Sequence, residues 1–395
     1  MIEISRAIFF HPANQEEKFH GRVFQEEGKT YCEILNYGTL AKLNTKFYID
    51  ILWVIDEMTN KKFSFVSLPV KSWNATGKAT FLITELYEGT WIPDVHEKVY
   101  TRCVIQMSGL AAWFGLPLID TSFENENVII KAKEDAEKEF ITSNNLSIIF
   151  RKFHQFKRDE LSVQIQENAS LILTCNDEMS RLYFNNLAKS FRYLLSIALP
   201  AIPRIWQIDH SSPGKNIVSL KIEKIGSHEI QQSNGILFNL TDISQLVISN
   251  WLEKQNQLNE ICSLIIEARE NIVIETSFTY CTKVFELIYK NLLLPESDQI
   301  FSVVIEKMKK ANIWENNWKE DKINVNSSKR NFRIVLCTLW EIFSSKEGFQ
   351  NTFNDPYAFL LKVQHSRNHY THLEYRNDFF GQSQLITVNK ILVAF

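Results

Sequence analysis

The sequence has few of the residues that interrupt or cross-link a chain. Its 395 residues include only 12 glycines, 9 prolines and 6 cysteines. No Gly/Ser-rich or Pro-rich linker is visible, so we expect domains that pack against each other. The cysteines lie far apart and form no C-x-x-C pair, which predicts buried free thiols in a reducing compartment rather than a disulfide framework.

The sequence also lacks a strong net charge and a long apolar run. A net charge of −3 argues against general attraction of nucleic acid, so any RNA contact needs a local basic patch. The first residues show no basic region followed by an apolar stretch. The longest apolar tract, around residues 193–202, falls short of the roughly 18 residues that span a membrane. We therefore expect a cytoplasmic protein with no membrane partner.

Aromatic residues, by contrast, are abundant. With 28 Phe, 12 Tyr and 9 Trp, and 45% hydrophobic residues overall, the chain can build its cores without disulfides or metals. Its length predicts two or three domains. No phosphate-binding glycine loop or nucleotide fingerprint is present, so we expect no cofactor.

The first 240 residues are dominated by strand patterns. Alternating or β-branched and aromatic segments, separated by turn residues, predict strands. These segments span residues 31–35, 46–55, 62–68, 79–84, 161–166 and 218–223. One helix is expected over 179–199, ended by Pro200, and the charged stretch 134–139 is expected to be a surface turn or short helix. We predict one β-rich domain over 1–240, and a division into two sub-lobes is one way in which it could be arranged.

After residue 240 the apolar spacing becomes helical. Helices are expected over 243–265, 278–292, 299–311 and 332–343, and another begins at Pro356 behind Asn354 or Asp355 as its cap. Short connections between helices favour a compact bundle. The predicted fold class is therefore α+β, with a β-rich N-terminal domain followed by an all-α bundle over 241–395.

The densest polar cluster is His365-Ser-Arg-Asn-His-Tyr-Thr-His372, at the end of that last helix. Asn368 and His372 are four residues apart and share a helix face. Arg367 and His372 are five apart, about 140° around an ideal helix. They converge only if the helix bends or ends there, and a helix terminus makes that geometry reasonable.

These residue types are sufficient to cut RNA, because the substrate supplies its own 2′-OH nucleophile. A histidine can take that proton or protonate the leaving 5′-oxygen. An arginine can hold the phosphate and stabilise its developing charge, and an asparagine can orient either group. The expected products are a 2′,3′-cyclic phosphate and a 5′-hydroxyl, formed without a metal ion.

Arg367, Asn368 and His372 match the Arg-x4–6-His signature of HEPN ribonucleases, and residues 359–374 resemble the ApeA-like HEPN branch. Residues 283–289, with Glu286, are similar to the first bundle helix of that branch, and His20-Gly21-Arg22-Val23 is a weaker N-terminal match. The family's closing helix extends further than this chain does, so we expect either a short final helix or a chain that is cut back.

The resemblance implies an anti-phage effector that halts translation by cutting RNA, with tRNA as the expected target. It implies a homodimer or higher oligomer in which two HEPN domains join their Arg/His sets. His372 would be the acid/base, Arg367 the phosphate clamp and Asn368 the positioning group. The N-terminal domain would sense infection, through a phage-derived trigger, or restrain the nuclease.

Further RNA-binding candidates are Lys329, Arg330, Arg333, His369 and Tyr370. The three basic residues could follow the RNA backbone or simply form a solvated helix face. Glu286 could position Arg367 through a charge-assisted pair or be an ordinary glutamate.

Other interpretations of the polar cluster remain open. Arg367 could cap the helix while His372 bonds locally. His365, His369 and His372 share a face and could hold zinc, with Asp378 as a remote fourth ligand, although our prediction is no metal site. The alternative function, from a different class, is a non-catalytic protein whose bundle scaffolds a partner.

Overall fold

The chain forms two compact units, Met1–Glu253 and Lys254–Phe395, which are described separately below. The computed structural model describes residues 3–26, 29–36, 48–74, 77–89, 91–92, 94, 96–124, 127–142, 145–158, 163–213, 218–221, 235–315, 331–344, 355–372 and 378–394.

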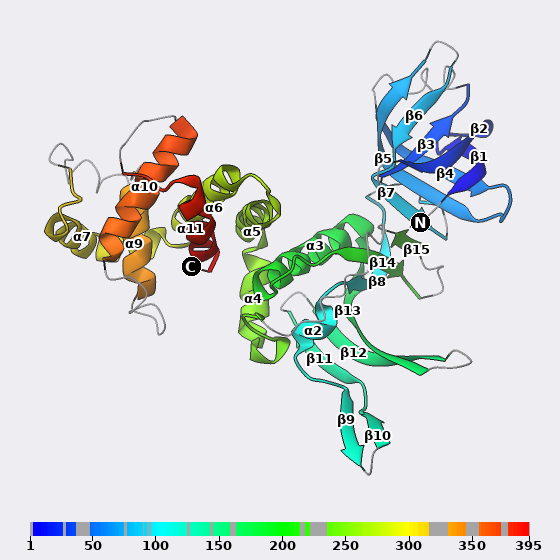
Figure 1. Ribbon diagram of the computed structural model, residues 1–395. Coiled ribbons are helices and arrows are strands. Elements are labelled where there is room, and N and C mark those ends of the chain that lie inside the picture. Colours follow the sequence, from blue (N-terminus) through cyan, green and yellow to red (C-terminus); the bar gives the residue numbers. More distant parts are fainter. Residues whose placement is uncertain are drawn as a thin grey trace. The chain divides into compact units, whose positions relative to one another are not determined.

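The N-terminal unit is built mainly of antiparallel strands (Figure 1). They are β1 (Ile4–His11), β2 (Asn14–Glu26), β3 (Lys29–Ile34), β4 (Tyr48–Asp56), β5 (Lys62–Trp73), β6 (Ala79–Leu82), β7 (Glu85–Glu88), β8 (Lys98–Met107), β9 (Ile119–Glu124), β10 (Asn127–Ala132), β11 (Ala136–Ile141), β12 (Leu146–Arg158), β13 (Val163–Ser180), β14 (Ile205–Ser211) and β15 (Val218–Lys221). The helical segments of this unit are α2 (Leu110–Phe114), α3 (Arg181–Ala198), the 3-10 turn η1 (Leu240–Asp242) and α4 (Gln245–Glu253).

Six of these strands close on themselves. The order β5-β4-β1-β2-β3-β6 ends with a second pairing of β6 to β5, so the ring has no free edge. Phe9, Leu52, Phe65 and Phe81 belong to the cluster of apolar side chains buried within the same strands. Gly21 on β2 is required by this packing, because a Cβ there would overlap the Glu33 carbonyl and lie 2.9 Å from the Phe9 ring.

The sheet continues from β7 through β15, β14, β8, β13 and β12 to β11. Helix α3 lies across β8 and β13 (Figure 1) and buries Phe184, Phe191 and Leu195. Its N-terminus is capped by Ser180, whose Oγ accepts from the Tyr183 N–H at 3.2 Å. The helix predicted over 179–199 is thus present, and it covers this part of the sheet.

A buried polar group lies where α3 meets the strands. His210 on β14 is completely buried, and neither of its ring nitrogens has a hydrogen-bond partner. The rings of Tyr100, Tyr87 and Phe184 surround it with centroids 5.3, 6.2 and 6.1 Å away. Burial first, and then the positive charge of Arg181, lower the pKa of His210 to about 3.

The prediction for residues 134–139 was wrong. This charged stretch leads into strand β11, which pairs along its whole length with β12. Its charges belong to an edge strand, where alternate side chains face solvent. On that strand the Lys138 ammonium donates to the carbonyl oxygens of Leu240 and Ile243, both at 2.8 Å. The strand therefore fastens the chain that leaves the sheet.

The same region explains where the N-terminal unit ends. The Gln245 side chain both donates to the Ile141 carbonyl at 2.8 Å and accepts from the Ile141 N–H at 3.2 Å. Trp251 donates its indole N–H to Ser190 Oγ at 2.9 Å. These contacts keep α4 with the sheet. The compact units consequently divide after Glu253, whereas the change from strand to helix spacing predicts a boundary at residue 240.

The C-terminal unit contains helices, joined by segments that are described only in part. They are α5 (Gln255–Glu270), α6 (Ile274–Leu292), α7 (Leu294–Lys310), α9 (Phe332–Ser344), α10 (Pro356–His372) and α11 (Gln382–Ala394). The expected fold class is confirmed: a β-rich N-terminal part is followed by a helical C-terminal part. Throughout the ranges given above, no helix is long and apolar enough to cross a membrane.

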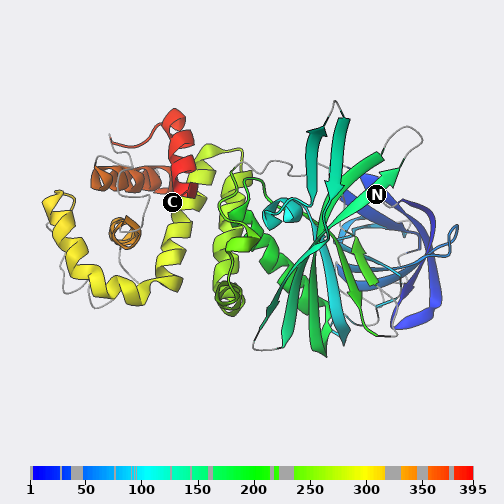
Figure 2. The same ribbon diagram turned by 90° about the horizontal axis from the view of Figure 1, so that it is seen from below.

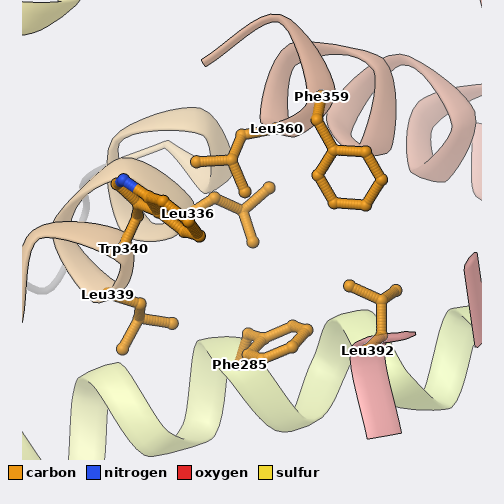
Figure 3. Close-up of a pocket in the computed structure, with 7 residues that line it drawn as sticks. All are labelled: Phe285, Leu336, Leu339, Trp340, Phe359, Leu360 and Leu392. Atoms are coloured by element: carbon orange, nitrogen blue, oxygen red, sulfur yellow. The ribbon is translucent and has the colours of Figure 1, made fainter. Parts of the chain in front are cut away.

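Helix α9 is the centre of this unit. All nine residues from Phe332 to Trp340 are buried, which is typical of a helix covered on every side. Figure 2 looks nearly along α9, with α6, α7 and α10 around it. The described helices α6, α9, α10 and α11 enclose a small apolar cavity of about 10 Å³ (Figure 3). Phe285, Trp340 and Leu392 are among its lining residues, and only apolar surface faces it.

Arg333 lies inside this unit, which corrects its assignment as an RNA-binding residue. Its side chain is about 4% exposed, and its donors are used internally. Nε donates to Gln364 Oε1 on α10 at 2.8 Å, Nη1 to the Ile313 carbonyl at 2.7 Å, and Nη2 to Glu315 Oε1 at 2.9 Å. The guanidinium therefore ties α9 to α10 and to the chain after α7.

His210 predicts a pH-dependent stability. Since its pKa is lowered on folding, the unfolded state binds the extra proton, and stability present above about pH 6.5 is lost as the pH falls towards 3, by about 1.4 kcal/mol per unit. His210→Phe should remove this component, which urea unfolding between pH 7.5 and 5 would measure. The exposed His96→Phe is the control. Equal pH slopes for wild type and His210→Phe would contradict the assignment.

Because Arg333 is a buried cation with internal partners, we expect its removal to lower the stability of the protein. Arg333→Met should destabilise the protein by about 3 kcal/mol, because it leaves the Gln364 and Ile313 oxygens without their donor. Urea unfolding would measure this loss. Lys310→Met removes an exposed cation from the same unit and should leave stability unchanged. A mild effect of Arg333→Met, matching that of Lys310→Met, would show that the internal network is not needed.

Candidate active site

The polar cluster is presented by α10, whose start is determined by its sequence. Asp355 caps the helix by accepting the Ala358 N–H at 3.0 Å, and Pro356 occupies the first turn, where a missing N–H costs nothing. Leu360 and Val363 are buried against the bundle. This anchoring sets the direction in which each later residue of the helix points.

Arg367 is held by side chains from two other helices. Its Nη2 donates to Glu286 Oε1 on α6 at 2.6 Å. Its guanidinium carbon lies 5.0 Å from the centre of the Phe332 ring on α9, a cation–π distance. The side chains of Arg367 and Glu286 are 26% and 22% exposed, so the pair is partly shielded but still reaches solvent. The charged fork is thus pre-oriented at the edge of the bundle.

His372 lies at the end of the same helix and is exposed, while Asn368 is half-buried. Helix α10 runs without interruption through His372. Five residues of α-helix separate Arg367 from His372 by about 140° around the axis and about 7.5 Å along it. The helix ends at His372, as expected, but it does not bend between the two residues, so their Cα–Cβ directions differ by about 140°.

The segment after the helix folds back on the side of α10 that carries His365 and His369. The Phe380 N–H donates to Ser366 Oγ, and the Tyr370 hydroxyl donates to the Phe380 carbonyl, both at 2.8 Å. His365 Nδ1 lies 3.2 Å from the Asp378 carbonyl oxygen. Residues 378–380 are consequently fixed to α10 close to its C-terminal end.

The three histidines on this side are not arranged as a metal site. The His369 ring stacks on Phe379 with centroids 4.0 Å apart and planes at 19°, while His365 faces the backbone of Asp378. Within the described part of the chain, no group of three or more His, Cys, Asp or Glu side chains could hold a metal ion.

The proposed RNA-contacting residues have different surroundings. Lys329 and Arg330 lie outside the described residues, and Arg333 is internal, as shown above. Tyr370 is half-buried, with its ring edge-on to Phe278 at 6.2 Å. His369 and Tyr370 therefore contribute to packing at the end of α10.

Two aromatic residues of this region were missed by the sequence analysis. Phe332 supports Arg367 and Phe379 stacks on His369. Phe332 fits the apolar spacing of its helix, so its sequence position predicts only a buried core residue. Phe379 follows the predicted helix with no periodic signal of its own, so nothing in the sequence distinguished it.

The comparisons with known proteins concern the N-terminal part of the chain. A family model described as ApeA N-terminal domain 1 matches residues 5–251. This match ends within two residues of the end of the N-terminal compact unit, in α4, which is held by hydrogen bonds to Ile141 of β11 and to Ser190 of α3. No curated protein and no solved structure matches the chain. Since the match covers more than half of its residues, the chain belongs to the ApeA family through this N-terminal domain.

Proposed function

We propose that the C-terminal unit is a HEPN-type endoribonuclease that cuts RNA without a metal ion. The supporting observation is the placement of Arg367, held by Glu286 over Phe332, about one and a half turns before an exposed His372 on the same helix. The membership of the ApeA family connects the chain with anti-phage defence. Cleavage of tRNA in the infected cell would stop translation, and a phage-derived trigger would act through the N-terminal unit.

The chemistry follows from the groups themselves. The 2′-oxygen of the substrate attacks the adjacent phosphorus, and the bond to the 5′-oxygen breaks. His372, exposed at a helix end, takes the 2′-proton or gives one to the 5′-oxygen. Arg367 holds the phosphate oxygens, and Glu286 keeps its fork in a fixed direction. Asn368, on the same face as His372, orients the phosphate or the imidazole.

The helix phase supports a site shared between two copies. In a single α10 the guanidinium and the imidazole leave the helix about 140° apart, so a second helix lying opposite would bring one of each more directly onto the same phosphate. A two-fold dimer of this unit would place Arg367 of one protomer against His372 of its partner, and the reverse, since such an interface uses the same patch twice. We therefore propose a homodimer, or a larger even assembly, through the C-terminal unit.

A second candidate is a non-catalytic scaffold, favoured by the internal partners of Arg367. An arginine paired with Glu286 and packed on Phe332 also serves to hold three helices together. In that case the unit would present α10 to a protein partner. The two functions differ in one measurable property, which is cleavage of RNA that resists a chelator and leaves cyclic-phosphate ends.

The proposed role of His372 as the acid/base predicts that RNA cleavage depends on its imidazole. His372→Ala should lower RNA cleavage by at least about 100-fold, because proton transfer loses its carrier, and leave the fold intact. Cleavage of labelled tRNA with EDTA, with and without lysate of infected cells as trigger, would measure it, together with growth arrest on expression. His96→Ala, an exposed histidine of the N-terminal unit, is the matched control.

The shared site is tested by mixing. Arg367→Ala and His372→Ala are each inactive alone, but co-expressed copies would form mixed dimers in which one intact Arg367 faces one intact His372. Recovered cleavage supports the composite cleft. A co-purified mixed dimer that stays inactive would show that both groups are needed from the same chain. Full cleavage by His372→Ala alone would remove the ribonuclease proposal.

If Glu286 orients the guanidinium of Arg367, removing its charge should slow the reaction. Glu286→Gln keeps the size of the side chain but removes the charge that directs Arg367, so kcat should fall about tenfold with KM little changed. Glu341→Gln is the control, since Glu341 pairs with Lys307 and Tyr357 elsewhere in the unit. Equal kcat losses in both variants would indicate a merely structural effect.

A further inference from the structure

The backbone on both sides of Phe379 is fixed to α10. The carbonyl of Asp378 lies 3.2 Å from His365 Nδ1, and the N–H of Phe380 donates to Ser366 Oγ at 2.8 Å. The Phe380 carbonyl accepts from the Tyr370 hydroxyl. An aromatic ring between two such anchors has little freedom to move, so its position is set before any ligand arrives.

The Phe379 ring itself is only partly covered. Phe380 beside it is buried, at 9% exposure, whereas Phe379 is half-buried and Asp378 is exposed. One face of the Phe379 ring stacks on the His369 imidazole with centroids 4.0 Å apart. Tyr370 approaches edge-on, with centroids 6.1 Å apart and planes at 84°. The contacts therefore fix the orientation of the ring while part of it stays exposed to solvent.

This ring lies close to the proposed acid/base group. His369 precedes His372 by three residues, which puts His372 about 4.5 Å further along the helix and about 60° around it. Both imidazoles are thus neighbours on one side of α10. A nucleotide whose phosphate reaches His372 has its base within reach of the ring stacked on His369.

RNA-binding proteins use such rings to hold unpaired bases, because every base has a π-face and stacking is worth a measurable part of the affinity. A base held out of the RNA stack also frees the ribose to bring its 2′-oxygen in line with the scissile phosphate. We propose that the Phe379–His369 pair is a stacking site for an unpaired base next to the cleaved phosphate. This inference rests on the proposed ribonuclease function and names the substrate: single-stranded or loop RNA.

The test uses the full chain carrying His372→Ala, so that RNA is bound but not cut. The probe is a single-stranded oligoribonucleotide with 2-aminopurine, whose fluorescence is quenched when the base stacks on an aromatic ring. Phe379→Leu keeps an apolar cover over α10 but removes the π-face, and should weaken binding at least about fivefold and abolish the quench. Phe379→Tyr keeps the ring and should bind as the parent does.

Phe156→Leu is the matched control, because Phe156 also packs a surface ring against a histidine, His154, in the N-terminal unit. Unchanged affinity and quench in Phe379→Leu, with its melting temperature preserved, overturn the stacking site. A change of oligomeric state in place of a change of RNA binding overturns it too, since the ring would then contact a second copy.

The same measurements separate this inference from the ribonuclease proposal. If the protein with intact His372 cuts RNA and the Leu variant binds normally, the nuclease stands and the stacking site is wrong. If no RNA is cut but binding depends on the Phe379 ring, the stacking site stands as an RNA-binding feature and the nuclease proposal is wrong.

Discussion

The ion pair between Arg367 and Glu286 is the contact on which the C-terminal unit's proposed chemistry depends. It joins α10 to α6, and the Phe332 ring below the guanidinium adds α9. A surface arginine would sample many rotamers, and a fully buried one could not reach a phosphate. At about one-quarter exposure, this arginine is restrained and still accessible. Arg333, which follows Phe332 on α9, is buried and holds α10 through its hydrogen bond to Gln364. Two adjacent residues of one helix therefore support the same catalytic candidate, one through its ring and one through its charge.

The N-terminal unit is organised around a different constraint, the closure of its sheet. Six strands close into a ring, while the other end of the sheet remains an edge at β11. That edge is used to hold the chain that leads out of the unit, through Lys138 and the backbone of Ile141. The family match ends with the same helix. The coincidence has a physical basis, because α4 shares hydrogen bonds with the sheet and moves with it as one folding unit.

Strong periodicity and local caps were what the sequence could reveal. The helix at 332–343 and the start of α10 behind Asp355 follow from apolar spacing and from capping chemistry, which act within a few residues. Residues 243–265 were wrongly expected as one helix, since a break at Lys254 separates α4 from α5. The charged residues of β11 are mostly exposed as expected, but the sequence did not show that they pair with β12. Arg333 was misassigned because charge indicates exposure only on average, and the partners of its buried guanidinium come from distant parts of the chain.

The phase of α10 sets the directions in which Arg367 and His372 leave the helix. In a continuous helix, the Cα–Cβ directions of residues five apart differ by about 140°, so the two side chains leave the helix on different sides. Arg367 is turned towards α6 and α9, and His372 follows His369 on the other side of the helix. In the proposed dimer, each copy would therefore contribute two half-sites, and a second helix related by a two-fold axis would complete both at once. Assembly would then control activity directly: any event in the N-terminal unit that changes how two copies meet would switch the chemistry on or off without altering a single catalytic residue.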